Sequence, residues 1–262
     1  MFYVLQKEYG KDFDIDVLAL KKEIEYTRRC NEYITFTKEE ISTADFRCSN
    51  VAIPVGTIEF VEGYLKNICK IEKMNPIEVP KVLRREEFLC RDYKIVDKDY
   101  VEKLDGKYFI KYASHLKDFS FVGDTNTLKE LNKKKNEILK EGFYVVSEIK
   151  EIISEYRIFV VDDDIKGIQF YNGDILTMPL PNEVKKIKKM TGMYVLDKDR
   201  PRAYTMDIAI IKNDKNQRDI MIIEVHPFAC VGLYGFNGNI LLNAYRYGID
   251  YYKEINKELE KD

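Results

Sequence analysis

Three side chains that can bind a metal ion occur close together in the C-terminal third of the chain: Asp207, Glu224 and His226. Asp207 and Glu224 each interrupt an otherwise apolar run, and a carboxylate buried in such a run is costly unless a cation meets it. Carboxylate oxygens are also the usual ligands of hard divalent cations. The two acids could therefore converge on one cation. The alternative is that both lie at strand ends in solvent.

Two strands must position these carboxylates. Residues 204–211 and 220–225 are rich in β-branched and apolar side chains, as strands are. The polar segment 213–216 between them is a strong turn signal. The pattern predicts a hairpin that brings Asp207 and Glu224 together.

A lysine near the end of an earlier strand is a second candidate. Residues 107–112 read as an apolar strand that contains Lys111, followed by a loop over 113–123 that contains Lys117. A lysine in an apolar strand is disfavoured unless its ammonium group reaches solvent or an anion. Lys111 could therefore bind an anionic ligand, or it could extend to solvent from an edge strand.

Two acidic residues and an arginine follow at regular spacing. Residues 143–149 read as a strand whose polar end carries Glu148, and Glu155 comes seven residues later. Glu155 and Arg157 share one face of the next strand, because side chains alternate across a strand. Glu155 could accept hydrogen bonds from a ligand, or it could form a structural salt bridge.

In this order the candidates resemble the ATP-grasp family. The pattern consists of Lys111, Glu148, Glu155-x-Arg157, Asp207 and Glu224-x-His226, then a loop with Gly232 and Gly235 and a final helix. The resemblance covers residues 107–252 well and the N-terminal third loosely. The string PVGTIEFV at 54–61 is similar to the N-terminal domain of a phage-associated ATP-grasp clade, named for an arginine-to-lysine change in its active site.

The resemblance implies a role for each candidate. It places the α- and β-phosphates of ATP at Lys111 and Lys117, the adenine at Val146, Glu148 and Ile149, the ribose at Glu155, the phosphates or an acyl group at Arg157, the γ-phosphate at Lys166 and Arg202, and Mg²⁺ at Asp207, Glu224 and His226. The family usually has asparagine where this chain has His226. Imidazole suits softer metals than magnesium, so Mn²⁺ is an alternative ion. His226 could instead hydrogen-bond a backbone carbonyl at the strand end.

The fold class that the resemblance implies is α/β (α+β). We expect an ATP-grasp fold of two α+β lobes that clasp ATP, preceded by a small α/β domain. The predicted boundaries are residues 1–90 for the first domain and 91–262 for the ATP-grasp domain. Within the latter, the small lobe would cover about 100–150 and the large lobe about 151–262.

Helical spacing predicts the remaining elements. Helices are expected at 16–30 with Asp16 as cap, at 58–70, at 81–89, at 127–141 with Gly142 as C-cap, at 181–191 and at 240–259. The apolar stripe of the last helix indicates core packing. The acidic triplet at 162–164 predicts a hairpin turn, because it lacks the spaced ligands of a calcium loop.

The resemblance implies an ATP- and Mg²⁺-dependent ligase that joins a carboxylate to an amine through an acyl phosphate. The partners would be small-molecule or peptide carboxylate and amine substrates. One alternative is a phosphotransferase that acts on a hydroxyl acceptor. Another is a nucleotide-binding protein without turnover, which His226 favours. The sequence does not indicate the oligomeric state.

Composition excludes several other classes. Of the 262 residues, 45% are hydrophobic, enough for a sizeable core, and the net charge of −2 gives no basic surface for nucleic acid. No apolar run is long enough for a bilayer, and no signal peptide is apparent. The five cysteines are widely spaced without a CxxC pair. We therefore expect the reducing cytoplasm, or the host cytoplasm if the protein is phage-encoded.

Overall fold

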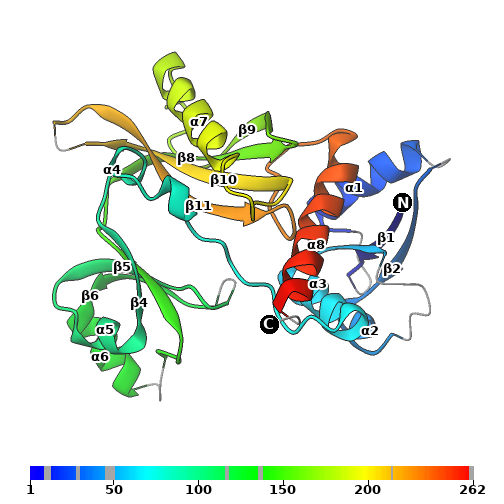
Figure 1. Ribbon diagram of the computed structural model, residues 1–262, viewed down its shortest axis with the longest axis horizontal. Coiled ribbons are helices and arrows are strands. Elements are labelled where there is room, and N and C mark those ends of the chain that lie inside the picture. Colours follow the sequence, from blue (N-terminus) through cyan, green and yellow to red (C-terminus); the bar gives the residue numbers. More distant parts are fainter. Residues whose placement is uncertain are drawn as a thin grey trace.

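The computed structural model describes residues 1–8, 13–27, 30–44, 51–115, 118–134, 138–213 and 215–259. The strands of these residues form three sheets, which Figure 1 shows as three separate units. No helix among them combines the length and apolar character needed to span a membrane.

The N-terminal unit is a parallel sheet of order β2-β1-β3 with helices around it. Its elements are β1 (Phe2–Gln6), α1 (Ile15–Tyr26), β2 (Glu32–Phe36), α2 (Lys38–Thr43), β3 (Ile53–Val55), α3 (Ile58–Tyr64) and the π-helical turn η1 (Leu65–Cys69). The prediction of Asp16 as the cap of α1 was wrong. Asp14 fills that position, because its carboxylate accepts a hydrogen bond of 2.9 Å from the Asp16 N–H.

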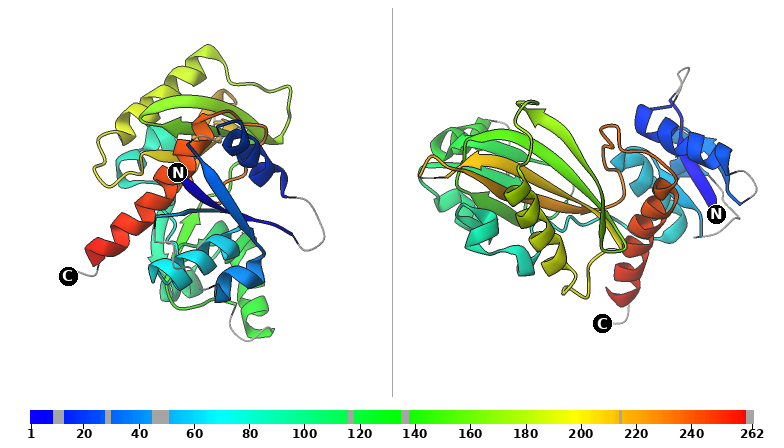
Figure 2. Two further views of the ribbon diagram at one scale, coloured as in Figure 1. Left: turned by 90° about the vertical axis from the view of Figure 1, so that its right-hand side faces the viewer. Right: turned by 90° about the horizontal axis from the view of Figure 1, so that it is seen from above.

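The C-terminal helix α8 (Ile240–Leu259) belongs to the same core as the N-terminal sheet. Its apolar stripe buries Leu241, Tyr245 and Ile249, which confirms the predicted core role. The Tyr3 hydroxyl donates a hydrogen bond of 3.0 Å to the Leu242 carbonyl. Figure 2 shows α8 between the large sheet and the N-terminal unit.

The small lobe is an antiparallel sheet of order β4-β7-β5-β6. Its elements are β4 (Tyr93–Asp97), α5 (Lys98–Lys103), β5 (Lys107–Tyr112), β6 (Ser120–Asp124), α6 (Thr125–Lys134) and β7 (Phe143–Ser147). Strand β6 takes up part of the predicted loop over 113–123, since it pairs with β5 along its length. The prediction of Gly142 as a C-cap was wrong. Helix α6 ends at Lys134, and the Asn132 side chain accepts from the Leu139 N–H as the chain turns back.

The large lobe is an antiparallel sheet of order β11-β10-β8-β9. Its elements are β8 (Ile152–Val161), β9 (Asp164–Gly173), α7 (Pro181–Tyr194), β10 (Ala203–Lys212) and β11 (Arg218–Pro227). The predicted β10–β11 hairpin is confirmed, with Asp207 directly opposite Glu224. One sheet face packs its apolar side chains against α7. By alternation, Arg157, Asp207 and Glu224 lie on the other face.

A linker joins the N-terminal unit to the small lobe and runs along the edge strand β11. It contains the short helical turns η2 (Lys81–Leu83) and α4 (Glu86–Leu89), which replace the single predicted helix at 81–89. The Val225 N–H donates a hydrogen bond of 2.9 Å to the Glu78 carbonyl. The linker is therefore fastened to β11 next to Glu224.

Candidate nucleotide site

A cavity of about 420 Å³ lies between the small and large lobes. It brings together candidates from three strands: Lys111 of β5, Glu155 and Arg157 of β8, and Glu224 and His226 of β11. Apolar side chains such as those of Phe109 and Ile223 also line it. A cavity with an apolar wall and a few convergent charged groups is typical of a ligand site.

Lys111 bridges the two lobes inside this cavity. Its Nζ lies 2.5 Å from Oε2 of Glu224 and 2.8 Å from Oε1 of Glu78. Burial alone would lower the pKa of Lys111, but the carboxylates of Glu224 and Glu78 raise it above its usual range. The ammonium group therefore stays charged.

Glu224 is engaged through both of its oxygens. Oε2 contacts Lys111, and Oε1 lies 2.8 Å from Nε2 of His226. Burial would raise the pKa of Glu224, but the His226 imidazole and the Lys111 ammonium hold it well below its usual range. His226 is thus a side-chain partner of Glu224 in this arrangement.

Glu78 is a member of this cluster that the sequence did not reveal. Its side chain is buried, and it meets Lys111 from the linker. Burial raises the pKa of Glu78, although the Lys111 ammonium opposes the shift. The available signal was an acid in an apolar, proline-flanked stretch, Pro76-Ile77-Glu78-Val79-Pro80.

Arg157 and Asp207 form a buried, two-pronged ion pair beside the cavity. Nε of Arg157 lies 2.8 Å from Oδ1 of Asp207, and Nη2 lies 2.7 Å from Oδ2. Nη1 donates to the Gly232 carbonyl at 3.1 Å, and the guanidinium lies over the rings of Tyr171 and Tyr234. Burial would lower the pKa of Arg157, but Asp207 raises it. Such a fork holds the guanidinium in one orientation.

The three predicted metal ligands do not form a metal site in this arrangement. Both Asp207 oxygens accept from Arg157, while both Glu224 oxygens contact Lys111 and His226. The described residues contain no group of three acidic, histidine or cysteine side chains that could hold an ion. The role of these residues as ligands stays a prediction, and it requires the ion pairs to open.

Glu155 lies on the cavity wall and is held by two neighbours. Oε2 accepts from the Tyr171 hydroxyl and Oε1 from Nδ2 of Asn172, both at 2.6 Å. These bonds orient the carboxylate from the adjacent strand β9. A ribose hydroxyl would share or replace them, and this role stays a prediction.

The structure places the other predicted residues outside the cavity. Lys166 contacts Asp164 at 2.9 Å, and Arg202 contacts Asp162 at 2.7 Å, both around the β8–β9 turn. They lie there because Asp162 and Asp163, with φ of 50° and 66°, turn the chain tightly between the strands. Val146 is buried in the small-lobe core, whereas Glu148 pairs with Lys150 and Ile149 is exposed. Lys117 lies outside the described residues.

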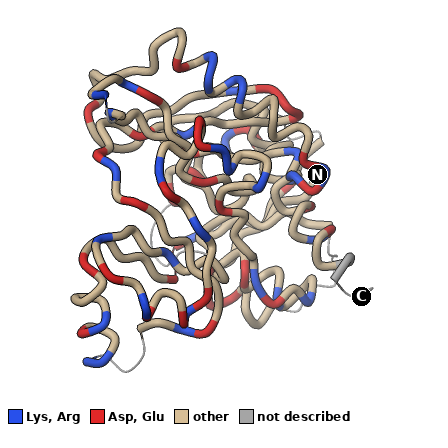
Figure 3. The backbone as a smooth tube through the Cα atoms, turned by 60° about the vertical axis from the view of Figure 1, so that its left-hand side comes forward, with Lys and Arg blue, Asp and Glu red and all other residues tan. Residues whose placement is uncertain are grey.

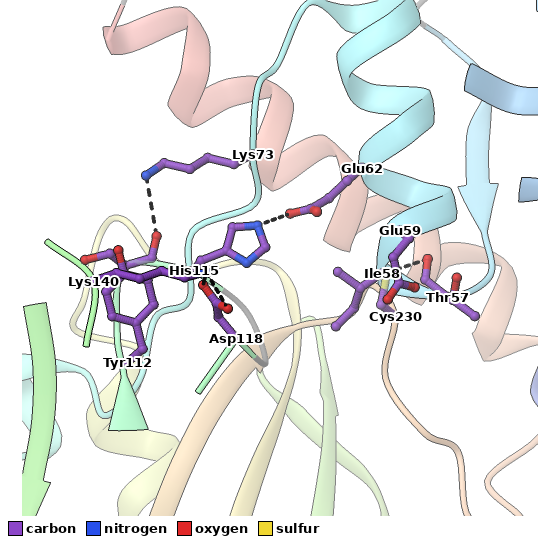
Figure 4. A pocket seen from close by; sticks show the side chains of 11 residues that line it. Thr57, Ile58, Glu59, Glu62, Lys73, Tyr112, His115, Asp118, Lys140 and Cys230 are labelled. Carbon is purple, nitrogen blue, oxygen red and sulfur yellow. Dashed lines mark hydrogen bonds and ion pairs between the residues drawn. The ribbon is translucent and has the colours of Figure 1, made fainter. Parts of the chain in front are cut away.

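A larger cavity of about 710 Å³ adjoins the first one and shares Ile58, Asp118 and Cys230 with it. Figure 4 shows its polar pairs: Glu62 with His115 at 3.2 Å, Asp118 with Lys140 at 2.7 Å, and Lys73 with the Ser114 carbonyl at 3.4 Å. Its walls come from α3, the linker and the small lobe. Charges of both signs therefore surround a space next to the candidate nucleotide site, in a chain where they alternate throughout (Figure 3).

A family comparison identifies this architecture. The model of the ATP-grasp domain, family 2 of the arginine-to-lysine clade, matches residues 88–244, which include both lobes and the cavity between them. The chain belongs to this clade of ATP-grasp proteins. The fold expected from the sequence is thereby confirmed. The domain boundary near residue 90 stays a prediction.

Solved structures share the ATP-grasp fold at low sequence identity. D-alanine–D-alanine ligase from Bacillus anthracis complexed with ATP aligns with a TM-score of 0.51 and 14% identity over 99% of this chain and 98% of the ligase. Macrocyclase MdnC from Microcystis aeruginosa, bound with precursor peptide MdnA, gives 0.51 and 11% over 95% and 98%. ATP-grasp ligase PsnB, complexed with a precursor variant, Mg and ADP, gives 0.51 and 12% over 94% and 98%. No curated protein matches the sequence.

Proposed function

We propose that this ATP-grasp protein is an ATP-dependent carboxylate–amine ligase that acts through an acyl phosphate. The observation that carries the proposal is the single cavity that gathers Lys111, Glu155 and Arg157 from both lobes. Two cations in a partly buried site can stabilise phosphate charge far better than they could in water. The ATP, and the Mg with ADP, bound by the structural neighbours support a nucleotide here.

Each cavity residue has a task in this proposal. Lys111 meets the α- and β-phosphates, Glu155 accepts from the ribose, and Arg157 faces the transferred phosphoryl group. A carboxylate oxygen of the acid attacks the γ-phosphorus, and ADP leaves. The amine nitrogen then attacks the acyl carbon, phosphate leaves, and the nitrogen loses a proton. The protein needs no covalent nucleophile, because orientation and charge do the work.

The adjoining cavity would hold the substrates that are joined. It borders the nucleotide cavity at Ile58, Asp118 and Cys230, so an acid bound there lies near the phosphates. Its volume of about 710 Å³ suits a small molecule or a peptide end. The precursor peptide bound by MdnC supports the peptide option.

The test measures ADP and phosphate release with Mg-ATP and a panel of carboxylates and amines, with mass spectrometry of the products. A ligase releases phosphate only when acid and amine are both present, and forms a new amide. Lys111→Met should abolish turnover. The matched control is Lys98→Met, since both lysines are in the small lobe, 15% and 16% exposed, and paired with a glutamate. Transfer of phosphate to a hydroxyl would identify a phosphotransferase instead.

A second candidate is a nucleotide-binding protein without turnover. The occupation of both oxygens of Asp207 and of Glu224 by protein side chains favours it. Calorimetry that shows ATP binding, combined with no ADP formation under any substrate combination, would support this candidate over the ligase.

A further inference from the structure

Glu78 belongs to the linker, yet its carboxylate reaches the cluster at the proposed nucleotide site. It is only 4% exposed, and its Oε1 lies 2.8 Å from Nζ of Lys111. A buried carboxylate is unfavourable without a cation, so the position of Glu78 depends on Lys111. The two residues are 33 positions apart in the chain and come from separate elements.

The backbone around Glu78 is fixed in an unusual conformation. Its φ of 58° lies in the left-handed region, which is unfavourable for a residue with a side chain. Its carbonyl accepts from the Val225 N–H at 2.9 Å, and the next N–H, of Val79, donates to the Tyr93 hydroxyl at 3.4 Å. These bonds hold the strained residue beside β11, with its carboxylate directed at Lys111.

Lys111 has two carboxylate partners, and they differ in how firmly they are held. Glu224 is more exposed than Glu78 and shares its charge with His226. Glu78 pairs with Lys111 and is fastened through its own backbone. When the nucleotide draws Lys111 away from Glu224, Glu78 can keep the ammonium at the boundary between the lobes.

We propose that Glu78 is a positioning residue that holds the Lys111 ammonium where the nucleotide phosphates meet it. This role rests on the proposed nucleotide site. Glu78 would act through Lys111 and would not touch the nucleotide. Without it, the ammonium is left to Glu224 and must break that contact to reach a phosphate.

The first test compares ADP with adenosine, which lacks phosphates. Calorimetry in magnesium buffer should show ADP binding to Glu78→Gln about tenfold more weakly than to the parent, with adenosine affinity unchanged. Glu183→Gln is the matched control, because Glu183 is also 4% exposed and pairs with Arg218 at 3.0 Å away from the cavity. That control should change neither affinity. Equal losses for ADP and adenosine in Glu78→Gln would indicate a merely structural role and overturn the proposal.

The second test repeats the substitution in a Lys111→Met background. There Glu78→Gln should add no further loss of ADP affinity, since its effect passes through Lys111. A loss of the same size in both backgrounds would overturn the proposal. A parent that binds neither ligand would overturn the proposed function and this role together.

A third measurement tests the contact without any nucleotide. Lys111→Met should lower the melting temperature, because it leaves Glu78 buried without its cation. Adding Glu78→Gln should then restore part of the loss. If the two effects on melting temperature simply add, the contact is not coupled and the proposal fails independently of nucleotide binding.

Discussion

At the scale of single residues, the candidate site is a set of matched charges. Asp207 and Glu224 lie opposite each other on β10 and β11, yet each turns to a different cation, Arg157 or Lys111. The pairing satisfies two carboxylates in a largely apolar setting. It also means that a substitution at either acid affects folding as well as ligand binding.

Asp207→Asn should lower the free energy of unfolding by about 3 kcal/mol, because it leaves the buried Arg157 guanidinium without its counter-charge. Urea denaturation measures the loss. The double variant Arg157→Met with Asp207→Leu should recover part of it, since an apolar pair leaves no buried charge. Parent-like stability of the single variant would contradict the view that this pair stabilises the fold.

Glu224 should link stability to pH with a definite sign. Burial would raise the pKa of its carboxyl, but His226 and Lys111 hold it well below the ordinary 4.5. The folded state then binds this proton less tightly than the unfolded state does. The contribution of Glu224 is therefore complete above about pH 4.5 and is lost as the pH falls through the lower folded value.

We expect Glu224→Gln to cost about 2 kcal/mol at neutral pH, less than a fully buried pair, because the Glu224 side chain is 21% exposed. The gap between parent and variant should shrink only below about pH 4.5. Urea titrations of both proteins across the acid range measure this gap. A gap that stayed constant into the strongly acidic range would refute the linkage.

At the scale of elements, helix α8 supports the site from behind. It packs in the N-terminal core and reaches the loop that follows β11. Gly248 lies against the Phe228 backbone, two residues after His226, so closely that a methyl group there would collide with the Phe228 carbonyl. The close approach of helix and loop helps to fix the end of β11.

Gly248→Ala should therefore destabilise the protein by about 2 kcal/mol, although alanine is the better helix former. Gly192→Ala is the control. Gly192 is also helical, in α7, and a methyl group there would meet nothing within 4 Å. It should stabilise the fold by up to about 1 kcal/mol. Thermal and urea unfolding compare the two, and a stabilised Gly248→Ala would disprove the close packing.

At the scale of the whole molecule, the cavity is formed by parts that are far apart in the chain. The small lobe supplies Lys111, the large lobe supplies Glu224, and the linker supplies Glu78. This ion-pair cluster spans the space between the lobes. A nucleotide in the cavity would contact both lobes at once and should stabilise their arrangement.

Mg-ATP at about 100 times its dissociation constant should stabilise the protein by roughly 2.7 kcal/mol. For a protein of this size, that corresponds to a rise of several degrees in melting temperature. Magnesium alone should leave the melting temperature unchanged, because protein cations already occupy the carboxylates. Thermal unfolding with Mg-ATP, Mg alone and neither decides. No shift with millimolar Mg-ATP would contradict a nucleotide site in this cavity.

The sequence by itself determined the elements that have strong local patterns. The predicted strands at 2–6 and 107–112 and the helix at 240–259 agree with β1, β5 and α8 at both ends. Period-2 alternation, a clear turn and a long apolar stripe act over a few residues and are readable without the fold. Strands β4 and β6 were missed, because their short, half-exposed sequences carry little of that pattern.

Only the tertiary structure decided which charges meet. The candidates Lys111, Glu155, Arg157 and Glu224 could be named from their residue types and order, and they do share one cavity. Their partners could not be named, because the Arg157–Asp207 fork depends on strand register, and Glu78 reaches Lys111 only through the course of the linker. Ion pairs between distant segments leave no local periodicity, so they appear only when packing has fixed the distances.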